Sequence, residues 1–156
     1  MKFKCPLIVV DDIDRSRKFY TEVLNQKVQL DFGENITFEG PFAIHLKSHF
    51  QKLIQNQPIT NYSNHSELYF EHDDVLGLQA QLEKAGVRFV HKTIQQPWKQ
   101  YVMRFYDPDG NLLEIGESME YLCKRLKEEG LLESEICSAT GLPAQFVKDA
   151  LRSAAD

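Results

Sequence analysis

The sequence lacks any apolar run long enough to span a membrane. A spanning helix needs about 20 consecutive apolar residues, whereas the apolar stretches here have the length of strands. The N-terminal segment MKFKCPLIVV also lacks a small-residue cleavage site, so it does not read as a signal peptide. We therefore expect a cytoplasmic protein with no membrane partner.

The chain also lacks an excess of basic residues. It has 18 Lys and Arg against 23 Asp and Glu, which gives a formal net charge of −5. Binding to phosphate backbones requires a basic surface. The balance therefore predicts that nucleic acid is not a partner.

Cysteine is scarce. Cys5, Cys123 and Cys137 are odd in number and widely spaced, which does not suit a disulfide framework. Reduced thiols in a cytoplasm are the better interpretation.

The first part of the chain has a strand-helix-strand-strand-strand pattern. A buried strand within residues 2–10 precedes Asp11-Asp12, and Asp12 is a good N-cap for a helix over Ile13–Leu24. Three strand-like runs follow, separated by turn residues; they are Val28–Phe32, Ile36–Glu39 and Phe42–Lys47. Residues 48–66 lose periodicity and predict a connector, with one helical turn at Phe50–Ile54.

The pattern then repeats. Asp73-Asp74-Val75 follows Asp11-Asp12-Ile13 by 62 residues, again between a strand, Glu67–His72, and a helix. Gly86 predicts the end of that helix, and strands follow at Val87–His91, Tyr101–Tyr106 and Asn111–Gly116. The repeat also places His45 and Glu114 at corresponding positions, each between two aliphatic residues of a final strand.

The last hairpin contains a polar residue that requires explanation. Asp107-Pro108-Asp109-Gly110 predicts a tight turn between apolar runs. Glu114 lies between Leu113 and Ile115, so alternation places it on the opposite face of the strand. That face is either solvent or a lined cavity.

Residues 118–156 have no counterpart in the repeat. They predict two or three short helices, with a helix-turn-helix outline from Ile136 to Leu151 around Gly141-Leu142-Pro143. Residues 117–156 hold eight acidic and five basic side chains. We therefore expect packing on the domain, a dimer mate or a protein partner rather than on DNA.

These motifs resemble the vicinal oxygen chelate superfamily, which includes glyoxalase I, extradiol dioxygenases and bleomycin-resistance proteins. The matching residues near the start and near the last hairpin are Val10, Asp12, Ser16, Phe19 and Tyr20, then Asp107, Pro108, Asp109, Gly110, Asn111 and Glu114. The resemblance covers about residues 1–117. It implies an α+β fold in which two βαβββ modules, residues 1–47 and 67–117, form a curved mixed sheet around a cavity. The helical C-terminal extension, residues 118–156, would be a separate domain.

The resemblance also implies a divalent metal site. Carried over by position, the ligands are Cys5, His45, Glu67 and Glu114, although metal-binding relatives commonly have His at the first and third positions and Glu at the second. One imidazole with carboxylates suits Zn²⁺, Ni²⁺, Mn²⁺ or Fe²⁺. Cys5 is alternatively a small core hydrophobe, and His65 is a backup ligand.

Two functions are consistent with this site. The first is a metal-dependent, glyoxalase-like lyase or isomerase that acts on a small oxygen-chelating metabolite, with Glu114, or Glu67, as general base. The alternative is a metal-free protein that binds an antibiotic or metabolite. In either case Arg104 and Trp98 are candidate substrate-binding residues, but Arg104 alternatively pairs with a cavity carboxylate and Trp98 caps a core edge. The resemblance further implies a homodimer.

Overall fold

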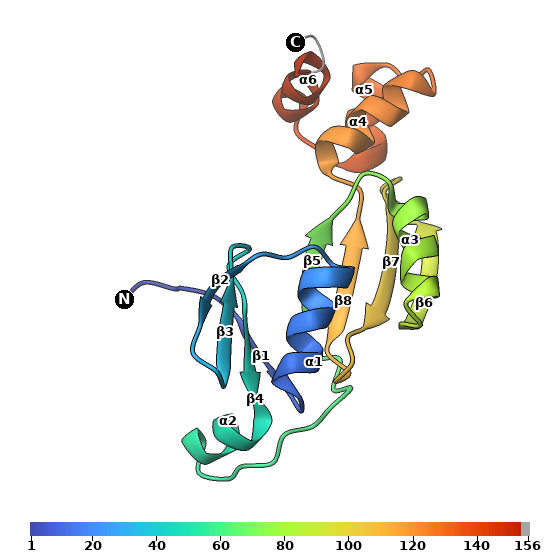
Figure 1. The fold of residues 1–156 in the computed structure, drawn as a ribbon. Helices are drawn as coiled ribbons and strands as arrows, with labels where there is room; N and C mark the ends of the chain where they lie inside the picture. Colours follow the sequence, from blue (N-terminus) through green and yellow to red (C-terminus); the bar gives the residue numbers. More distant parts are fainter. Residues whose placement is uncertain (154–156) are drawn as a thin grey trace. The chain divides into compact units, whose positions relative to one another are not determined.

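The computed structural model describes residues 1–153 and has an α+β fold (Figure 1). Its eight strands form two four-stranded sheets, in the orders β1-β4-β3-β2 and β5-β8-β7-β6. The two orders correspond strand for strand, so the repeat in the sequence is a repeat of structure. The predicted α+β fold of two βαβββ modules is thereby confirmed, with one four-stranded sheet in each module. No helix within residues 1–153 is long and apolar enough to cross a membrane.

The first sheet is mixed. Its strands are β1 (Leu7–Val10), β2 (Val28–Asp31), β3 (Asn35–Phe38) and β4 (Ala43–Leu46). β1 runs parallel to β4, with Val9 beside His45, and β3 runs antiparallel to both β2 and β4. α2 (Lys47–Leu53) follows β4 directly, so it is longer than the single turn that the sequence predicted.

The helix predicted over Ile13–Leu24 forms in two parts. α1 spans Ile13–Lys18 and continues as a π-helix, η1 (Phe19–Val23). The Asp12 carboxylate accepts a hydrogen bond from the Arg15 amide at 3.0 Å, so Asp12 is the N-cap that the sequence predicted. Phe19 and Tyr20 are buried, because the apolar face of the helix covers the first sheet.

The second sheet has the same plan. Its strands are β5 (Glu67–Glu71), β6 (Arg88–Gln95), β7 (Tyr101–Tyr106) and β8 (Leu112–Gly116). α3 (Val75–Lys84) follows β5, and Gly86 adopts the left-handed conformation, φ +74°, after the helix ends. β6 is longer at its C-terminal end than the sequence predicted.

The chain divides into two compact units. The first contains Met1–Glu67, Leu82–Arg88 and Tyr106–Leu112; the second contains Leu68–Gln81, Phe89–Phe105 and the described chain from Leu113 onward. The helical extension therefore clusters with the second sheet. The domain boundary predicted near residue 117 stays a prediction.

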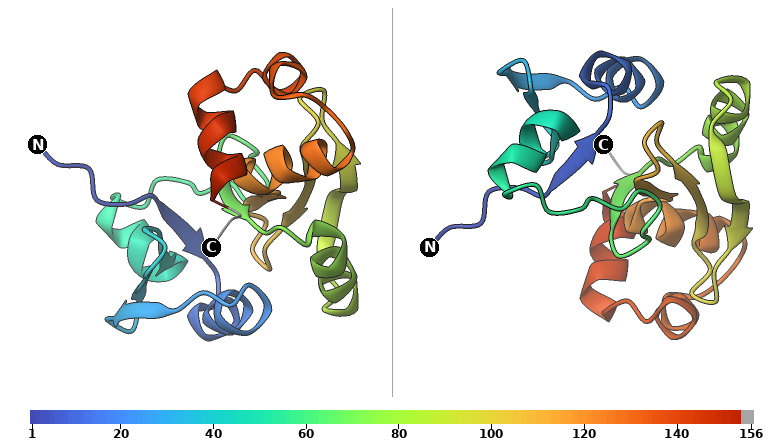
Figure 2. Two further views of the ribbon diagram at one scale, coloured as in Figure 1. Left: turned by 90° about the horizontal axis from the view of Figure 1, so that it is seen from above. Right: turned by 90° about the horizontal axis from the view of Figure 1, so that it is seen from below.

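Three helices form the predicted extension: α4 (Met119–Glu128), α5 (Glu133–Thr140) and α6 (Ala144–Arg152). Figure 2 shows these three helices at the orange and red end of the colour scale. They surround a core of their own, which includes Leu122, Ile136 and Val147. Gly141, with φ +75°, ends α5 at the predicted turn. The buried Glu117 carboxylate accepts hydrogen bonds from the Arg125 guanidinium at 2.7 and 2.9 Å, which fixes the start of the extension.

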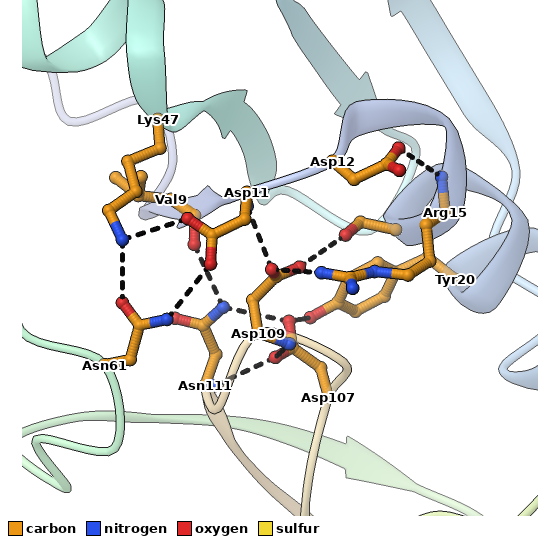
Figure 3. A network of polar contacts seen from close by, with 11 residues as sticks. Val9, Asp11, Asp12, Arg15, Tyr20, Lys47, Asn61, Asp107, Asp109 and Asn111 are labelled. Atoms are coloured by element: carbon orange, nitrogen blue, oxygen red, sulfur yellow. Dashed lines mark hydrogen bonds and ion pairs between the residues drawn. The ribbon is translucent and has the colours of Figure 1, made fainter.

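The turn between β7 and β8 binds the start of α1 (Figure 3). The Asp109 carboxylate is buried and accepts hydrogen bonds from the Asp11 amide at 2.9 Å, the Ser16 hydroxyl at 2.7 Å and the Arg15 guanidinium at 2.5 Å. Three donors from one short segment therefore converge on one carboxylate that is more than 90 residues distant in the chain.

A second carboxylate of the same turn holds the rest of the network. Asp107 accepts hydrogen bonds from the Tyr20 hydroxyl at 2.9 Å and from the Asp109 and Asn111 amides. The Asn111 side chain in turn donates to the Val9 carbonyl at 3.2 Å. Burial raises the pKa of Asp107, and burial together with the Asp107 charge raises the pKa of Tyr20 well above its usual value.

We predict that Asp109→Ala lowers the free energy of unfolding by about 2–4 kcal/mol. The reason is that the Arg15 guanidinium, the Asp11 amide and the Ser16 hydroxyl lose their hydrogen-bond acceptor. Chemical denaturation of the full chain measures this. Asp31→Ala, which breaks the more exposed Arg17–Asp31 ion pair, is the control and should cost less than about 1 kcal/mol. Equal losses in the two variants would contradict the network's role.

Alkaline pH should destabilise the fold through Tyr20. The pKa of Tyr20 in the folded protein lies above the unfolded value of 10. The contribution of Tyr20 to the free energy of unfolding is therefore fully present below pH 10 and is lost as the pH rises further. Tyr20→Phe should reduce this alkaline loss, although it also removes the hydrogen bond to Asp107. Denaturation curves from pH 8 to 11, with the partly exposed Tyr121→Phe as control, measure the slope; an unchanged slope in Tyr20→Phe would refute the assignment.

Candidate functional site

Glu114 is buried in β8. Its neighbours Leu113 and Ile115 are buried on the opposite face, and Glu114 itself is only 7% exposed. It forms an ion pair with Arg104 of β7. Of the two alternatives for Arg104, pairing with a carboxylate is therefore the one present in the structure. The Arg104 side chain is the more exposed partner, at 26% against 9%.

Tyr69 and Gln100 lie on the same face as Glu114. A Cβ atom added to Gly116, two residues along β8, would lie 2.7 Å from the Gln100 amide nitrogen and 3.4 Å from the Tyr69 ring. Because residues two apart in a strand share a face, these two side chains belong to the surface that carries Glu114.

A chain of polar contacts crosses this surface. The Trp98 indole donates to the side-chain oxygen Oε1 of Gln100 at 2.8 Å, and the side-chain nitrogen Nε2 of Gln100 donates to the Tyr69 hydroxyl at 3.1 Å. Tyr69 then donates to Glu71 at 3.2 Å. Burial, with a further contribution from Glu71, raises the pKa of Tyr69 to about 12, so it remains a neutral donor at physiological pH.

Two exposed apolar side chains lie on the neighbouring strand β6. Val90 and Ile94 of β6 are 49% and 48% exposed. They alternate with Phe89, whose ring contacts the core residue Phe105 on the opposite face. The face of the second sheet that carries Arg104 therefore has exposed apolar side chains beside charged ones, and we refer to it as the open face.

His45, the counterpart of Glu114, has different partners. Its Nδ1 lies 3.1 Å from the side-chain nitrogen Nδ2 of Asn35, and its Nε2 lies 2.8 Å from Nδ1 of His49, which follows in α2. Burial and the nearby His49 lower the pKa of His45. His45 is thus a neutral imidazole with both ring nitrogens engaged.

The four predicted metal ligands are divided between the compact units, with Cys5, His45 and Glu67 in the first and Glu114 in the second, so the predicted set stays a prediction. Cys5 lies before β1, whereas Val9 is the residue beside His45; Glu67 is exposed at the start of β5, and the backup ligand His65 is exposed in the connector. No group of three or more His, Cys, Asp or Glu side chains within residues 1–153 is placed to hold a metal ion. His45 and Glu114 each have a partner within their own unit, and the metal site that the sequence predicts stays a prediction.

Comparison with known proteins identifies the family. The Glyoxalase-like domain family matches residues 3–120. The chain belongs to the glyoxalase-like domain family. The resemblance to the vicinal oxygen chelate superfamily is thereby confirmed, and the helical extension lies almost entirely outside the match.

Solved structures share the fold of this glyoxalase-like protein. A protein of unknown function from Agrobacterium tumefaciens is 38% identical, with a TM-score of 0.69 over 76% of this chain and 95% of that one. A lactoylglutathione lyase from Agrobacterium tumefaciens is 22% identical, with a TM-score of 0.57 over 73% and 92%. A glyoxalase-related enzyme from Fulvimarina pelagi is 18% identical, with a TM-score of 0.64 over 76% and 89%. No curated protein matches the chain.

Sequence reasoning missed three residues near the predicted positions of this glyoxalase-like protein, one in the first compact unit and two in the second. His49 lies four residues after His45, a spacing that signals proximity once a turn of helix follows the strand. Tyr69 lies two residues after Glu67 and so shares its face. Nothing in the sequence indicates Gln100, because its contacts form only when β5, β7 and β8 are side by side.

We predict that Arg104→Met lowers the free energy of unfolding of the glyoxalase-like domain by about 2–4 kcal/mol, because it leaves the Glu114 charge buried without its partner. The double variant Arg104→Met with Glu114→Met should recover most of this loss, since it removes both charges. Urea denaturation of the single and double variants measures the coupling. Additive losses in the double variant would show that the pair does not interact.

Proposed function

We propose that this glyoxalase-like protein binds a small, oxygen-rich organic molecule on the open face of its second sheet, without a metal ion. The observation that carries the proposal is the Arg104–Glu114 ion pair, which holds the Arg104 guanidinium in a fixed position on this face. The more exposed partner is the cation. A ligand that reaches the pair therefore meets guanidinium N–H groups, which suit carboxylate and carbonyl oxygens.

The surroundings support the same proposal. Small-molecule sites are mostly apolar with a few fixed polar groups. Val90 and Ile94 supply exposed apolar surface, and the hydrogen bond from Gln100 to Tyr69 fixes a neutral hydroxyl on the same face. The protein thus offers orientation and apolar contact, which is what binding of an antibiotic or metabolite requires.

A metal-dependent lyase or isomerase that acts on a small oxygen-chelating metabolite is the second candidate. The observation in its favour is that His45 and Glu114 occupy matching positions in β4 and β8, the corresponding strands of two equivalent sheets. For this activity Glu67 and Cys5 would have to join them, with Glu114 as base. We also propose a homodimer on the basis of the family, which light scattering on the purified chain tests.

Pyruvate, a small α-oxo carboxylate, is a suitable probe to separate the two candidates. We expect calorimetric binding that is unchanged after treatment with EDTA. Arg104→Lys should weaken it about tenfold, because lysine keeps the charge but loses the planar fork. Lys84→Gln, which removes an exposed charge on α3, is the control and should bind as the unmodified protein does.

Other outcomes would overturn the metal-free proposal. Loss of pyruvate binding on chelation, one equivalent of metal by elemental analysis and loss of that metal in Glu114→Gln would establish the second candidate instead. Binding that is indifferent to Arg104→Lys would remove the ion pair from the site.

A further inference from the structure

The buried side chain of Gln100 has a partner for each of its polar atoms. It is 2% exposed. Its Oε1 accepts a hydrogen bond from the Trp98 indole at 2.8 Å, and its Nε2 donates to the Glu117 carbonyl at 2.7 Å and to the Tyr69 hydroxyl at 3.1 Å. An indole N–H can only donate and a main-chain carbonyl can only accept. The amide of Gln100 therefore has a single orientation that satisfies its partners.

The orientation of Gln100 determines the direction of the Tyr69 proton. Because Nε2 of Gln100 is only a donor, the Tyr69 oxygen accepts in that contact and its own proton points elsewhere. The proton is directed to Oε1 of Glu71, at an oxygen–oxygen distance of 3.2 Å. Both side chains of this contact are exposed. A ligand can therefore reach this hydrogen bond, which is the longest of the chain of contacts from Trp98 to Glu71.

The Tyr69 hydroxyl and Arg104 belong to one face of the second sheet. β5 and β8 are neighbours, and the His72 amide, directly after β5, donates to the Gly116 carbonyl of β8 at 2.9 Å. Gly116 has no side chain to cover this region; a Cβ atom there would lie 3.4 Å from the Tyr69 ring. Two residues before Gly116, on the same face, Glu114 pairs with Arg104. A ligand on this face therefore meets a guanidinium and an oriented hydroxyl.

The contact between Tyr69 and Glu71 discriminates among polar groups. A hydroxyl can accept the Tyr69 proton and donate its own proton to Glu71, so it replaces one long hydrogen bond with two. A carbonyl oxygen accepts from Tyr69 but donates nothing to Glu71. A carboxylate also accepts from Tyr69, but it then lies beside the Glu71 charge, and like charges repel. An ammonium group cannot accept at all. The contact therefore favours a hydroxyl.

We propose that the ligand of the open face is a hydroxy acid. Its carboxylate binds the Arg104 guanidinium, and its hydroxyl inserts between Tyr69 and Glu71, accepting from the first and donating to the second. Gln100 is a positioning residue, because it directs the Tyr69 proton toward the ligand without touching the ligand itself. This inference rests on the proposed function of the open face and names the class of molecule that the face binds.

Hydroxy acids and their parents without the hydroxyl test the ligand class by calorimetry on the full chain. Lactate is compared with propionate, and 3-hydroxybutyrate and 4-hydroxybutyrate are compared with butyrate, so that the separation of the two groups varies. We expect at least one hydroxy acid to bind about fivefold more tightly than its parent. Succinate, which has a second carboxylate in place of the hydroxyl, should bind no more tightly than butyrate. Equal affinity of every hydroxy acid and its parent would overturn the inference.

Tyr69→Phe removes the hydroxyl and keeps the ring. It should abolish the preference for the hydroxy acid and leave the binding of the parent acid unchanged. Tyr121→Phe, which removes an exposed tyrosine hydroxyl on α4, is the matched control and should keep the preference. A preference that survives in folded Tyr69→Phe would show that another group binds the hydroxyl.

Gln100→Met tests the positioning role, because it removes the donor to Tyr69 and keeps the length of the side chain. It should reduce the preference several-fold. The ring signals of Tyr69 in NMR spectra should shift on addition of the hydroxy acid but not of its parent, and this shift should be lost in Gln100→Met. Thermal unfolding shows whether the variant is folded. Trp98→Phe, which removes the indole donor to Oε1, is a milder variant with the same expected direction. An unchanged preference in the folded variants would contradict the role of Gln100.

Failure of the ligand class and failure of the proposed function give different results. If propionate, butyrate and pyruvate show no binding that depends on Arg104, the proposed function is wrong and this inference with it. If these acids bind through Arg104 but a hydroxyl adds no affinity, only the ligand class is wrong.

Discussion

The fold depends on two carboxylates in one turn. Asp107 and Asp109 are buried, and together they bind the hydroxyls of Tyr20 and Ser16 across sequence separations of 87 and 93 residues. Each carboxylate also accepts main-chain N–H groups. Buried carboxylates are tolerated only when hydrogen-bond donors surround them. The turn between β7 and β8 therefore needs the donors of α1 and η1, and these donors need the carboxylates of the turn. Asp107 and Asp109, two residues of the motif near the last hairpin, therefore have a structural role in this network.

Regular elements were predictable because their causes are local. Alternation, capping residues and turn chemistry predicted β7 at its observed bounds and Asp12 as an N-cap. Features that depend on tertiary contacts were not predictable. The π-helical end of the first helix and the length of β6 are set by packing and hydrogen bonding between segments distant in the chain.

The site was only partly predictable for the same reason. Alternation placed Glu114 opposite Leu113 and Ile115, and it placed Arg104 on the same side of the sheet. Aligned positions do not determine register, however, and in the parallel pairing of β1 and β4 the residue beside His45 is Val9 rather than Cys5. A motif alignment thus identified which residues are polar within apolar strands, but the contacts that give them a role come from the folded sheets.

His45 and Glu114, at the two matching positions of the repeat, avoid an unbalanced buried charge in different ways. In the first unit His45 is an uncharged imidazole held by Asn35 and His49. In the second unit the Glu114 charge is balanced by Arg104. A divalent ion at Glu114 would lie close to the guanidinium, and like charges a few ångströms apart in a partly buried site repel by several kcal/mol at an effective dielectric constant of about 20. The arginine must move before such an ion can bind. Glu114 therefore has a cationic partner in the second unit, whereas His45 has two uncharged partners in the first.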